Sequence, residues 1–328
     1  MTHAQGAPSP SGTPAPSGTP APSGAFDAFD AFDAFERRAW GGKADAYARS
    51  FGLLCAHPVP ELLDAALDIA LDATGATAGG RMLDVGAGTG TVAAAALARG
   101  AEVTAVDAEP SMVAAAARAL PGADVRLATL PQLPFPDGEF DAVIGNFVLN
   151  HVGRPRAALA ELRRVTRPGG RIAVTVWGYP PAPGQSLLGR AVAAAGVPRP
   201  PDFPTLAPDE DFPRTEAGLT GLFADARLPG ATARTLAWDH RVDPDTWWSG
   251  PAAGIASVGQ LLTAQPPSVV AAVRAEFDRL AAEFTTPEGL LALPHTAVLA
   301  VADVPRHGRP PRTHRARTPP TRRAPGAP

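Results

Sequence analysis

The stretch LDVGAGTG, residues 83–90, decides the fold. It ends a short apolar run, Arg81–Val85, with three glycines at alternate positions, and the Ala-rich residues 91–99 follow. The run predicts a buried strand and the Ala-rich segment predicts a helix. Glycines between them let the backbone pass close beneath a ligand, because a side chain there would occupy the ligand's space. The unpaired N–H groups at the start of the helix suit a carboxylate or a pyrophosphate.

Strands and helices alternate on both sides of this turn. Apolar residues at helical spacing predict helices at residues 60–73, 110–120, 155–165 and 269–284. Short apolar runs predict strands at residues 103–106, 125–128, 140–144, 171–176, 232–242 and 290–302. This alternation predicts an α/β fold with a mostly parallel sheet covered on both faces, and a ligand at the carboxyl ends of its strands. The Pro-rich residues 179–213 are too irregular for a strand and predict a lid.

The ends of the chain differ in composition from this region. Residues 1–24 repeat SGTPAP and residues 304–328 are rich in Arg and Pro, so we expect both to be disordered tails. Between the first tail and the core, residues 25–39 contain an Ala-Phe-Asp repeat. The repeat predicts an N-terminal helix or linker that docks on the core, with a partner-binding helix as the alternative.

Composition excludes several classes of function. Seven of the 29 basic residues lie from Arg306 onward, so the rest of the chain carries 22 basic against 32 acidic residues. An acidic body argues against a nucleic-acid-binding domain. The chain has one cysteine, Cys55, and no apolar window of 18 residues. We therefore expect a cytoplasmic protein without a membrane span or a Cys-based metal site.

The glycine spacing distinguishes two cofactors. The dinucleotide fingerprint requires G-x-G-x-x-G, whereas here the third glycine comes one residue early, at Gly90, and Thr91 takes its place. Asp107 ends the second predicted strand, where a carboxylate can accept hydrogen bonds from both ribose hydroxyls. NAD enzymes share that acid, so the glycine spacing alone makes an NAD(P)-dependent oxidoreductase the disfavoured alternative.

Three further stretches carry a family resemblance: residues 133–152 (LPFPDGEFDAVIGNFVLNHV), 157–165 (AALAELRRV) and 167–177 (RPGGRIAVTVW). With the glycine turn, they resemble class I S-adenosylmethionine-dependent methyltransferases of the ubiquinone/menaquinone-biosynthesis type (methyltransferase type 11 domain). The resemblance implies a Rossmann-like, seven-stranded, mostly parallel sheet with an antiparallel last strand. It also implies a cofactor-binding core at residues 40–178. Residues 179–303 would complete the same domain with a lid, late strands and a substrate-binding helical insertion.

The resemblance further implies methyl transfer from S-adenosylmethionine to a small organic acceptor, without a metal. The implied cofactor-binding residues are Tyr47, Asp84, Gly86, Ala87, Gly88, Gly90, Asp107, Ala108, Met112, Thr129, Leu130 and Asn146. The glycine turn would lie under the methionine and ribose. Asp84 would orient that turn or meet the methionine amino group, and Asp107 would bind the ribose hydroxyls.

The remaining implied contacts surround the adenine and the methionine. Ala108 and Met112 would flank the adenine. Thr129 stands where relatives usually carry an acid for the adenine amino group, and a hydroxyl binds more weakly than a carboxylate. Asn146 would face the methionine, and Tyr47 would close over the cofactor or serve packing alone.

Candidates for chemistry follow the later strands. His151, after the fourth predicted strand, is the candidate general base for an acceptor that must lose a proton, or a structural side chain that caps its loop. His240, beside Asp239, is a weaker candidate. Trp247 and Trp248 predict an apolar or aromatic acceptor pocket, or packing of the insertion onto the sheet. A non-catalytic protein that binds S-adenosylmethionine on the same fold stays an alternative.

Overall fold

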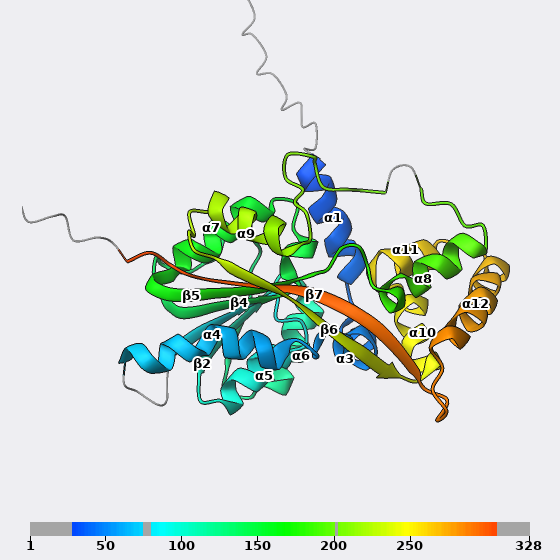
Figure 1. Ribbon diagram of the computed structural model, residues 1–328, viewed down its shortest axis with the longest axis horizontal. Helices are drawn as coiled ribbons and strands as arrows, with labels where there is room; N and C mark the ends of the chain where they lie inside the picture. The colour runs from blue at the N-terminus through cyan, green and yellow to red at the C-terminus, as the bar shows by residue number, and fades with distance from the viewer. Residues whose placement is uncertain (1–27, 75–79, 201–202, 307–328) are drawn as a thin grey trace, which may run out of the picture.

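The computed structural model describes residues 28–74, 80–200 and 203–306, and the expectation for residues 1–24 lies outside them. Within the described residues, seven strands form one sheet (Figure 1). The strands are β1 (Arg81–Val85), β2 (Glu102–Asp107), β3 (Asp124–Leu127), β4 (Phe140–Asn146), β5 (Thr166–Trp177), β6 (Thr232–Val242) and β7 (Leu291–Asp303). Their order is β3-β2-β1-β4-β5-β7-β6, and β7 runs antiparallel to both of its neighbours. The predicted fold class is confirmed.

The strand β1 shows why the sheet forms from this sequence. Four of its five residues are buried, since parallel neighbours on both sides and helices on both faces leave no contact with water. Side chains alternate between the faces. Leu83 and Val85 join one apolar cluster and Met82 joins the other. The edge strand β3, by contrast, is largely exposed.

Two helical layers cover the sheet (Figure 1). One layer contains α4 (Val59–Thr74), α5 (Thr91–Ala98) and α6 (Pro110–Ala119), and the other contains α7 (Pro155–Val165) and α9 (Glu216–Asp225). Helix α7 places Leu159 and Leu162, both fully buried, against the sheet. The 3-10 turn η1 (Val148–His151) follows β4 directly.

A third group of helices gathers at one end of β6 and β7 (Figure 1). It contains α8 (Pro183–Ala194), α10 (Pro244–Ala252), α11 (Ala256–Thr263) and α12 (Pro267–Ala281), with the short turn η2 (Ala282–Phe284) after α12. The expectation that residues 179–213 are irregular is wrong for α8. Its Leu187 and Ala191 are fully buried, and Gly184 lets it approach β7, because a Cβ there would lie 2.6 Å from the Pro294 carbonyl oxygen.

The Ala-Phe-Asp repeat forms a docked helix. Residues 28–40 form α1 (Ala28–Trp40), which leads into α2 (Ala44–Arg49) and α3 (Phe51–Cys55). Phe32 is buried, the Phe35 ring meets the Phe203 ring edge-on at 4.8 Å, and the Arg154 guanidinium lies over the Phe29 ring. The docking that the repeat predicted is therefore present in the described part of this segment.

The Arg/Pro-rich tail begins later than expected. Val304 is buried and its N–H donates to the Gly170 carbonyl at 2.8 Å, so residues 304–306 continue the fold, and residues 307–328 lie outside the described part. Across the residues that the structure describes, the helices are too short or too polar to cross a membrane.

Candidate functional site

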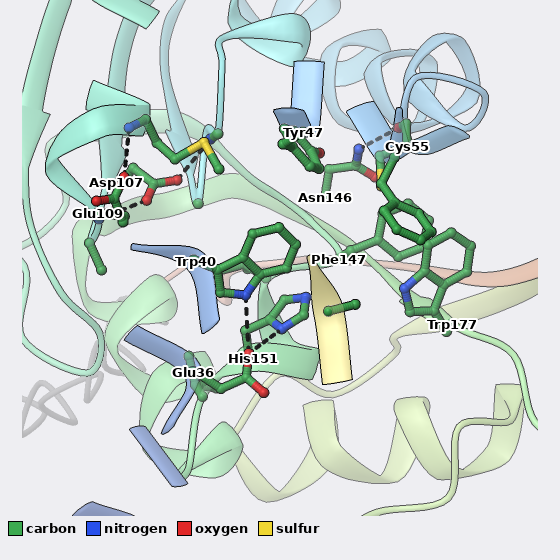
Figure 2. Close-up of a pocket in the computed structure, with 18 of the residues that line it drawn as sticks. Glu36, Trp40, Tyr47, Cys55, Asp107, Glu109, Asn146, Phe147, His151 and Trp177 are labelled. Carbon is green, nitrogen blue, oxygen red and sulfur yellow. Dashed lines mark hydrogen bonds and ion pairs between the residues drawn. The ribbon is translucent and has the colours of Figure 1, made fainter. Parts of the chain in front are cut away.

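A cavity of about 530 Å³ opens at the carboxyl ends of β1, β2 and β4 (Figure 2). Helices α1, α8, α10 and α11 complete its walls. Ten residues predicted from the sequence line it: Tyr47, Gly86, Gly88, Asp107, Ala108, Met112, Thr129, Leu130, Asn146 and His151. The sheet edge has therefore brought together most of the residues that the resemblance implied.

Three of the implied cofactor-binding residues lie outside the lining: Asp84, Ala87 and Gly90. Gly90 has a φ of +92°, and a Cβ there would lie 3.0 Å from a Leu120 methyl group, so its role is to let α5 pack beside α6. Gly86 has a φ of +70°, and a Cβ there would lie 2.6 Å from Val148. The turn therefore needs glycine at residue 86 to bring η1 against the cavity floor.

Asp84 is fully buried beneath the turn. Its Oδ2 accepts a hydrogen bond from the Ala93 N–H at 3.1 Å, and its Oδ1 has no partner among the described residues. Burial raises the pKa of Asp84 to about 7. Of the two roles that the resemblance implied, this geometry fits the orienting of the turn on α5.

Asp107 ends β2 at the cavity wall. Its Oδ2 accepts from the Gly88 N–H at 2.8 Å and its Oδ1 from the Glu109 N–H at 2.9 Å. Burial raises the pKa of Asp107, against the opposing effect of these two bonds. Each carboxylate oxygen keeps a lone pair for a further donor. We call this side of the cavity the strand wall (Gly86, Gly88, Asp107, Ala108 and Met112).

Glu109 also lines the cavity, and the sequence analysis missed it. It caps α6 by accepting from the Met112 N–H at 2.9 Å, and it accepts from the Gly42 N–H at 3.2 Å. An acid directly before Pro110, which is a helix-start signal, could have revealed it. Glu109 thereby ties the segment after α1 to the strand wall.

Asn146, at the end of β4, and Tyr47, on α2, line the cavity on the side away from Asp107 (Figure 2). The Asn146 amide donates to the Cys55 carbonyl at 2.8 Å and accepts from the Thr175 hydroxyl at 2.6 Å. Burial raises the pKa of Tyr47 well above its usual value, and its ring meets Trp40 edge-on at 5.6 Å. Asn146 thereby joins β4 to α3, and Tyr47 packs α2 against the end of α1.

His151, at the end of η1, pairs with a carboxylate that the sequence analysis did not single out. Its Nδ1 lies 2.8 Å from Glu36 Oε2, and the Trp40 indole N–H donates to the same oxygen at 3.1 Å (Figure 2). Burial acts to raise the pKa of Glu36, but His151 and the two hydrogen bonds outweigh it, so the pKa is below its usual value. Glu36 and Trp40 lie on α1 one helical turn apart.

The opposite side of the cavity is aromatic, and we call Phe147, Trp177, Trp247 and His295 the aromatic wall. Phe147 has a φ of +61°, an unfavourable conformation for a side chain of this size, and stacks on Trp177 at 3.9 Å. The Trp247 indole nitrogen is buried without a partner among the described residues. Of the predicted tryptophan pair, Trp247 faces the cavity.

The other two late candidates lie away from the cavity lining. Trp248 packs against Phe277 at 5.4 Å, so its role is the packing alternative. His240 is buried outside the lining, with its Nδ1 3.1 Å from His57 Nε2. Burial lowers the pKa of His240 to about 4, and burial likewise lowers the pKa of His295 to about 4. Both imidazoles are therefore neutral near pH 7.

Comparisons with known proteins agree with this geometry. Residues 83–174 match the family described as a methyltransferase domain. The demethylmenaquinone methyltransferase of Beutenbergia cavernae is 44% identical over 120 residues, which are 36% of this chain and 50% of that protein. An uncharacterized protein of Mycobacterium tuberculosis is 36% identical over 169 residues, 50% of this chain and 60% of that protein. The chain spans about half the length of the curated relatives it matches.

Solved structures show weaker likeness. The YcgJ protein of Bacillus subtilis gives a TM-score of 0.45 at 20% identity and covers 74% of this chain and 99% of its own. An N-methyltransferase of Haemonchus contortus, bound to S-adenosylhomocysteine, gives 0.47 at 14% identity and covers 83% of this chain and 60% of its own. The sequence match over residues 83–174 and the observed sheet order together confirm that the chain resembles class I S-adenosylmethionine-dependent methyltransferases.

Proposed function

We propose that the protein transfers a methyl group from S-adenosylmethionine to a small organic acceptor by in-line displacement. One observation carries the proposal: a cavity joins the strand wall, built by the matched segment, to an aromatic wall to which this segment contributes only Phe147. Its volume of about 530 Å³ lies in the range of small-molecule sites.

The residues on the strand wall fit the cofactor. Asp107 is a half-buried carboxylate with lone pairs left for the ribose hydroxyls. Gly88 beside it adds no side chain to the cavity, and the Tyr47 ring packs against its Cα position. Met112 and Ala108 are small or apolar groups of the kind that pack on adenine, with Thr129 beside them in the lining. Asn146 and Tyr47 would hold the methionine end.

Methyl transfer from this cofactor requires few catalytic groups from the protein. S-adenosylmethionine supplies an already activated methyl group, so the protein mainly provides proximity and alignment. The aromatic wall would place the acceptor, because flat apolar rings pack well against Phe147 and Trp177. The named activity of the demethylmenaquinone methyltransferases is consistent with an apolar acceptor. A cavity of this size favours a small molecule over a nucleic acid, as does the acidic body of the chain.

Calorimetric titration with S-adenosylmethionine and, separately, NADH tests the proposal. We expect S-adenosylmethionine to bind with a Kd of about micromolar order and Asp107→Ala to weaken it at least about tenfold, as for a lost charged hydrogen bond. Glu288→Ala, at an exposed carboxylate of the turn before β7, is the matched control.

Absence of binding by a folded sample, shown free of co-purified S-adenosylmethionine and S-adenosylhomocysteine, would contradict the proposal. Binding without transfer to any acceptor tried would favour the non-catalytic alternative instead.

A further inference from the structure

Helix α1 contains the last copies of the Ala-Phe-Asp repeat, and the final copy differs in one residue. Ala-Phe-Asp occurs three times, and the fourth copy is Ala-Phe-Glu, with Glu36 in place of aspartate. Because a period of three falls short of the 3.6 residues of a helical turn, successive acids turn around the helix. Asp33 and Glu36 both line the cavity.

These two acids hold the same loop in different ways. Asp33 accepts from the backbone N–H of Gly153 at 2.6 Å. Glu36, one methylene longer, reaches the side chain of His151, with Oε2 2.8 Å from Nδ1. The one copy of the repeat that carries glutamate in place of aspartate is therefore the copy whose acid contacts the His151 imidazole.

The Glu36 carboxylate is held in place on α1. The Trp40 indole N–H donates to the same oxygen at 3.1 Å, and the Trp40 ring stands edge-on to the His151 ring at 5.2 Å (Figure 2). Only 17% of the Glu36 side chain is exposed, so solvent screens this pair less than a surface pair.

The pairing fixes the imidazole. A neutral ring that donates its Nδ1–H to a carboxylate carries its free lone pair on Nε2. His151 Nε2 has no hydrogen-bond partner among the described residues. In Figure 2 it lies on the side of the ring away from Glu36. His151 is thus presented to the cavity as a base.

We propose that Glu36 is a positioning residue that holds His151 as the Nδ1–H tautomer, and that the acceptor is an uncharged aromatic molecule bearing a hydroxyl group. The inference rests on the proposed function, because it names the acceptor class of that same site. In the reaction the hydroxyl proton moves to His151 Nε2 while the oxygen forms its bond to the methyl carbon. The methyl–sulfur bond breaks with its electron pair left on sulfur. The products are a methyl ether, S-adenosylhomocysteine and an imidazolium paired with Glu36.

The choice of a hydroxyl follows from acidity. A phenol has a pKa near 10 and is almost wholly protonated at pH 7, so it gains most from a base. A neutral amine attacks with its own lone pair, and a thiol with a pKa of about 8.5 ionises more readily. A base held by a buried carboxylate is therefore best matched to oxygen.

The charges in the lining favour an uncharged acceptor. Four carboxyl groups line the cavity, those of Asp33, Glu36, Asp107 and Glu109, against the single guanidinium of Arg37. A carboxylate or phosphate on the acceptor would meet this acidic surround. The aromatic wall supplies the complementary surface for a flat ring.

The tautomer can be measured without an acceptor. In the full chain with ¹⁵N-labelled histidine, and with His151→Gln to assign the signals, we expect protonated Nδ1 and bare Nε2 at pH 8. Glu36→Gln keeps an oxygen for the Trp40 N–H but removes the charge, so the Nδ1–H form should lose population. Arg38→Gln, exposed on the same helix, should leave the tautomer unchanged. An unchanged tautomer in Glu36→Gln would overturn the positioning role.

The acceptor class is tested with three matched probes: 2-naphthol, 2-naphthylamine and 2-naphthalenethiol. We expect methyl transfer to 2-naphthol, with kcat lowered about tenfold or more by Glu36→Gln. Glu36→Asp should fall between Glu36→Gln and the wild type. The Kd for S-adenosylmethionine should stay within about twofold in each variant, because the change concerns proton transfer alone.

Each remaining outcome has one meaning. If S-adenosylmethionine binds but 2-naphthol is not methylated, the hydroxyl acceptor is excluded. If 2-naphthol is methylated at a rate that Glu36→Gln leaves unchanged, the positioning role of Glu36 is excluded. The proposed function stands in both cases. If S-adenosylmethionine does not bind, the proposed function fails, and the tautomer still decides whether Glu36 positions His151.

Discussion

Hydrogen bonds from backbone N–H groups to one nearby carboxylate hold the strand wall of the cavity, whereas side chains from distant segments build the aromatic wall. Asp107 accepts hydrogen bonds from the N–H groups of Gly88 and Glu109, and all three residues lie within 23 positions of Gly86, which begins the glycine turn after β1. The aromatic wall instead joins Phe147, which directly follows β4, and Trp177 of β5 to Trp247 of α10 and His295 of β7. The difference suits a site in which one wall binds a fixed cofactor and the other determines the acceptor. Substitutions can therefore be chosen to affect one wall and spare the other.

The largest effect is expected at Gly86. Gly86→Val puts a branched side chain at a φ of +70° and within van der Waals overlap of Val148, so it should abolish cofactor binding and destabilise the fold by more than about 3 kcal/mol. Gly122→Val is the matched control, with a φ of +89° and open space around it. Urea unfolding and calorimetry on both variants measure the difference. Equal losses in the two variants would show that the overlap with Val148 contributes nothing.

The next largest effect is the pH dependence of stability, which differs between the strand wall and the aromatic wall. Asp84, beneath the strand wall, keeps its proton up to about pH 7 when folded, so its stabilisation is present at low pH and lost as pH rises through 7. Asp84→Asn should therefore raise the free energy of unfolding at pH 8 by about 2 kcal/mol, and less at pH 5. Unfolding curves at both pH values, with the exposed carboxyl variant Asp137→Asn as control, check this. An equal gain at both values would show that Asp84 is ionised in the folded protein.

Two buried histidines, His295 of the aromatic wall and His240 outside the cavity lining, affect stability in the opposite direction with pH. His240 and His295 stay neutral to about pH 4 when folded, whereas the unfolded chain takes up protons below about pH 6.5. Stability is therefore present above pH 6.5 and lost as pH falls toward 4. His240→Gln should flatten that loss between pH 6.5 and 5, measured by urea unfolding. A wild-type profile that is already flat in this window would contradict the assignment.

A smaller effect is expected from the ring stack. Trp177→Leu removes the stacking with Phe147, worth about 1 kcal/mol, and should raise the KM for an aromatic acceptor about fivefold. The Kd for S-adenosylmethionine should change less than about twofold, since Trp177 lies on the other wall. Steady-state kinetics measures the KM for the acceptor, and calorimetry measures the Kd for S-adenosylmethionine. Equal losses of cofactor and acceptor binding would show that the two walls are not separable.

The smallest effect concerns Thr129. Thr129→Asp introduces the acid that the family resemblance implies at this place in the lining and should tighten S-adenosylmethionine binding about threefold. Thr129→Asn, in which the new side chain has the size of aspartate but no charge, is the control. Weaker binding in Thr129→Asp alone would mean that the cavity disfavours a further carboxylate beside Asp107.

The contrast between the walls also explains what could be predicted from sequence. The strand wall follows from local pattern, because residues 83–90 encode strand, turn and helix start in consecutive positions. Glu36 and Phe147 carry no such pattern, since their roles depend on contacts with His151 and Trp177, 115 and 30 residues away. Helix α8 was missed because flanking prolines hid the spacing of Leu187 and Ala191, which is helical.

The order of strands has a consequence for assembly of the site. Strand β7 is last in the chain yet lies between β5 and β6, pairing with β5 over residues 297–303 and with β6 over residues 291–301. Until β7 has been synthesised, β6 has no neighbour in the sheet, whereas β1 to β5 already pair with one another. During translation the strand wall can therefore form well before His295 arrives to complete the aromatic wall. A nascent chain would have its cofactor side first and its acceptor side last.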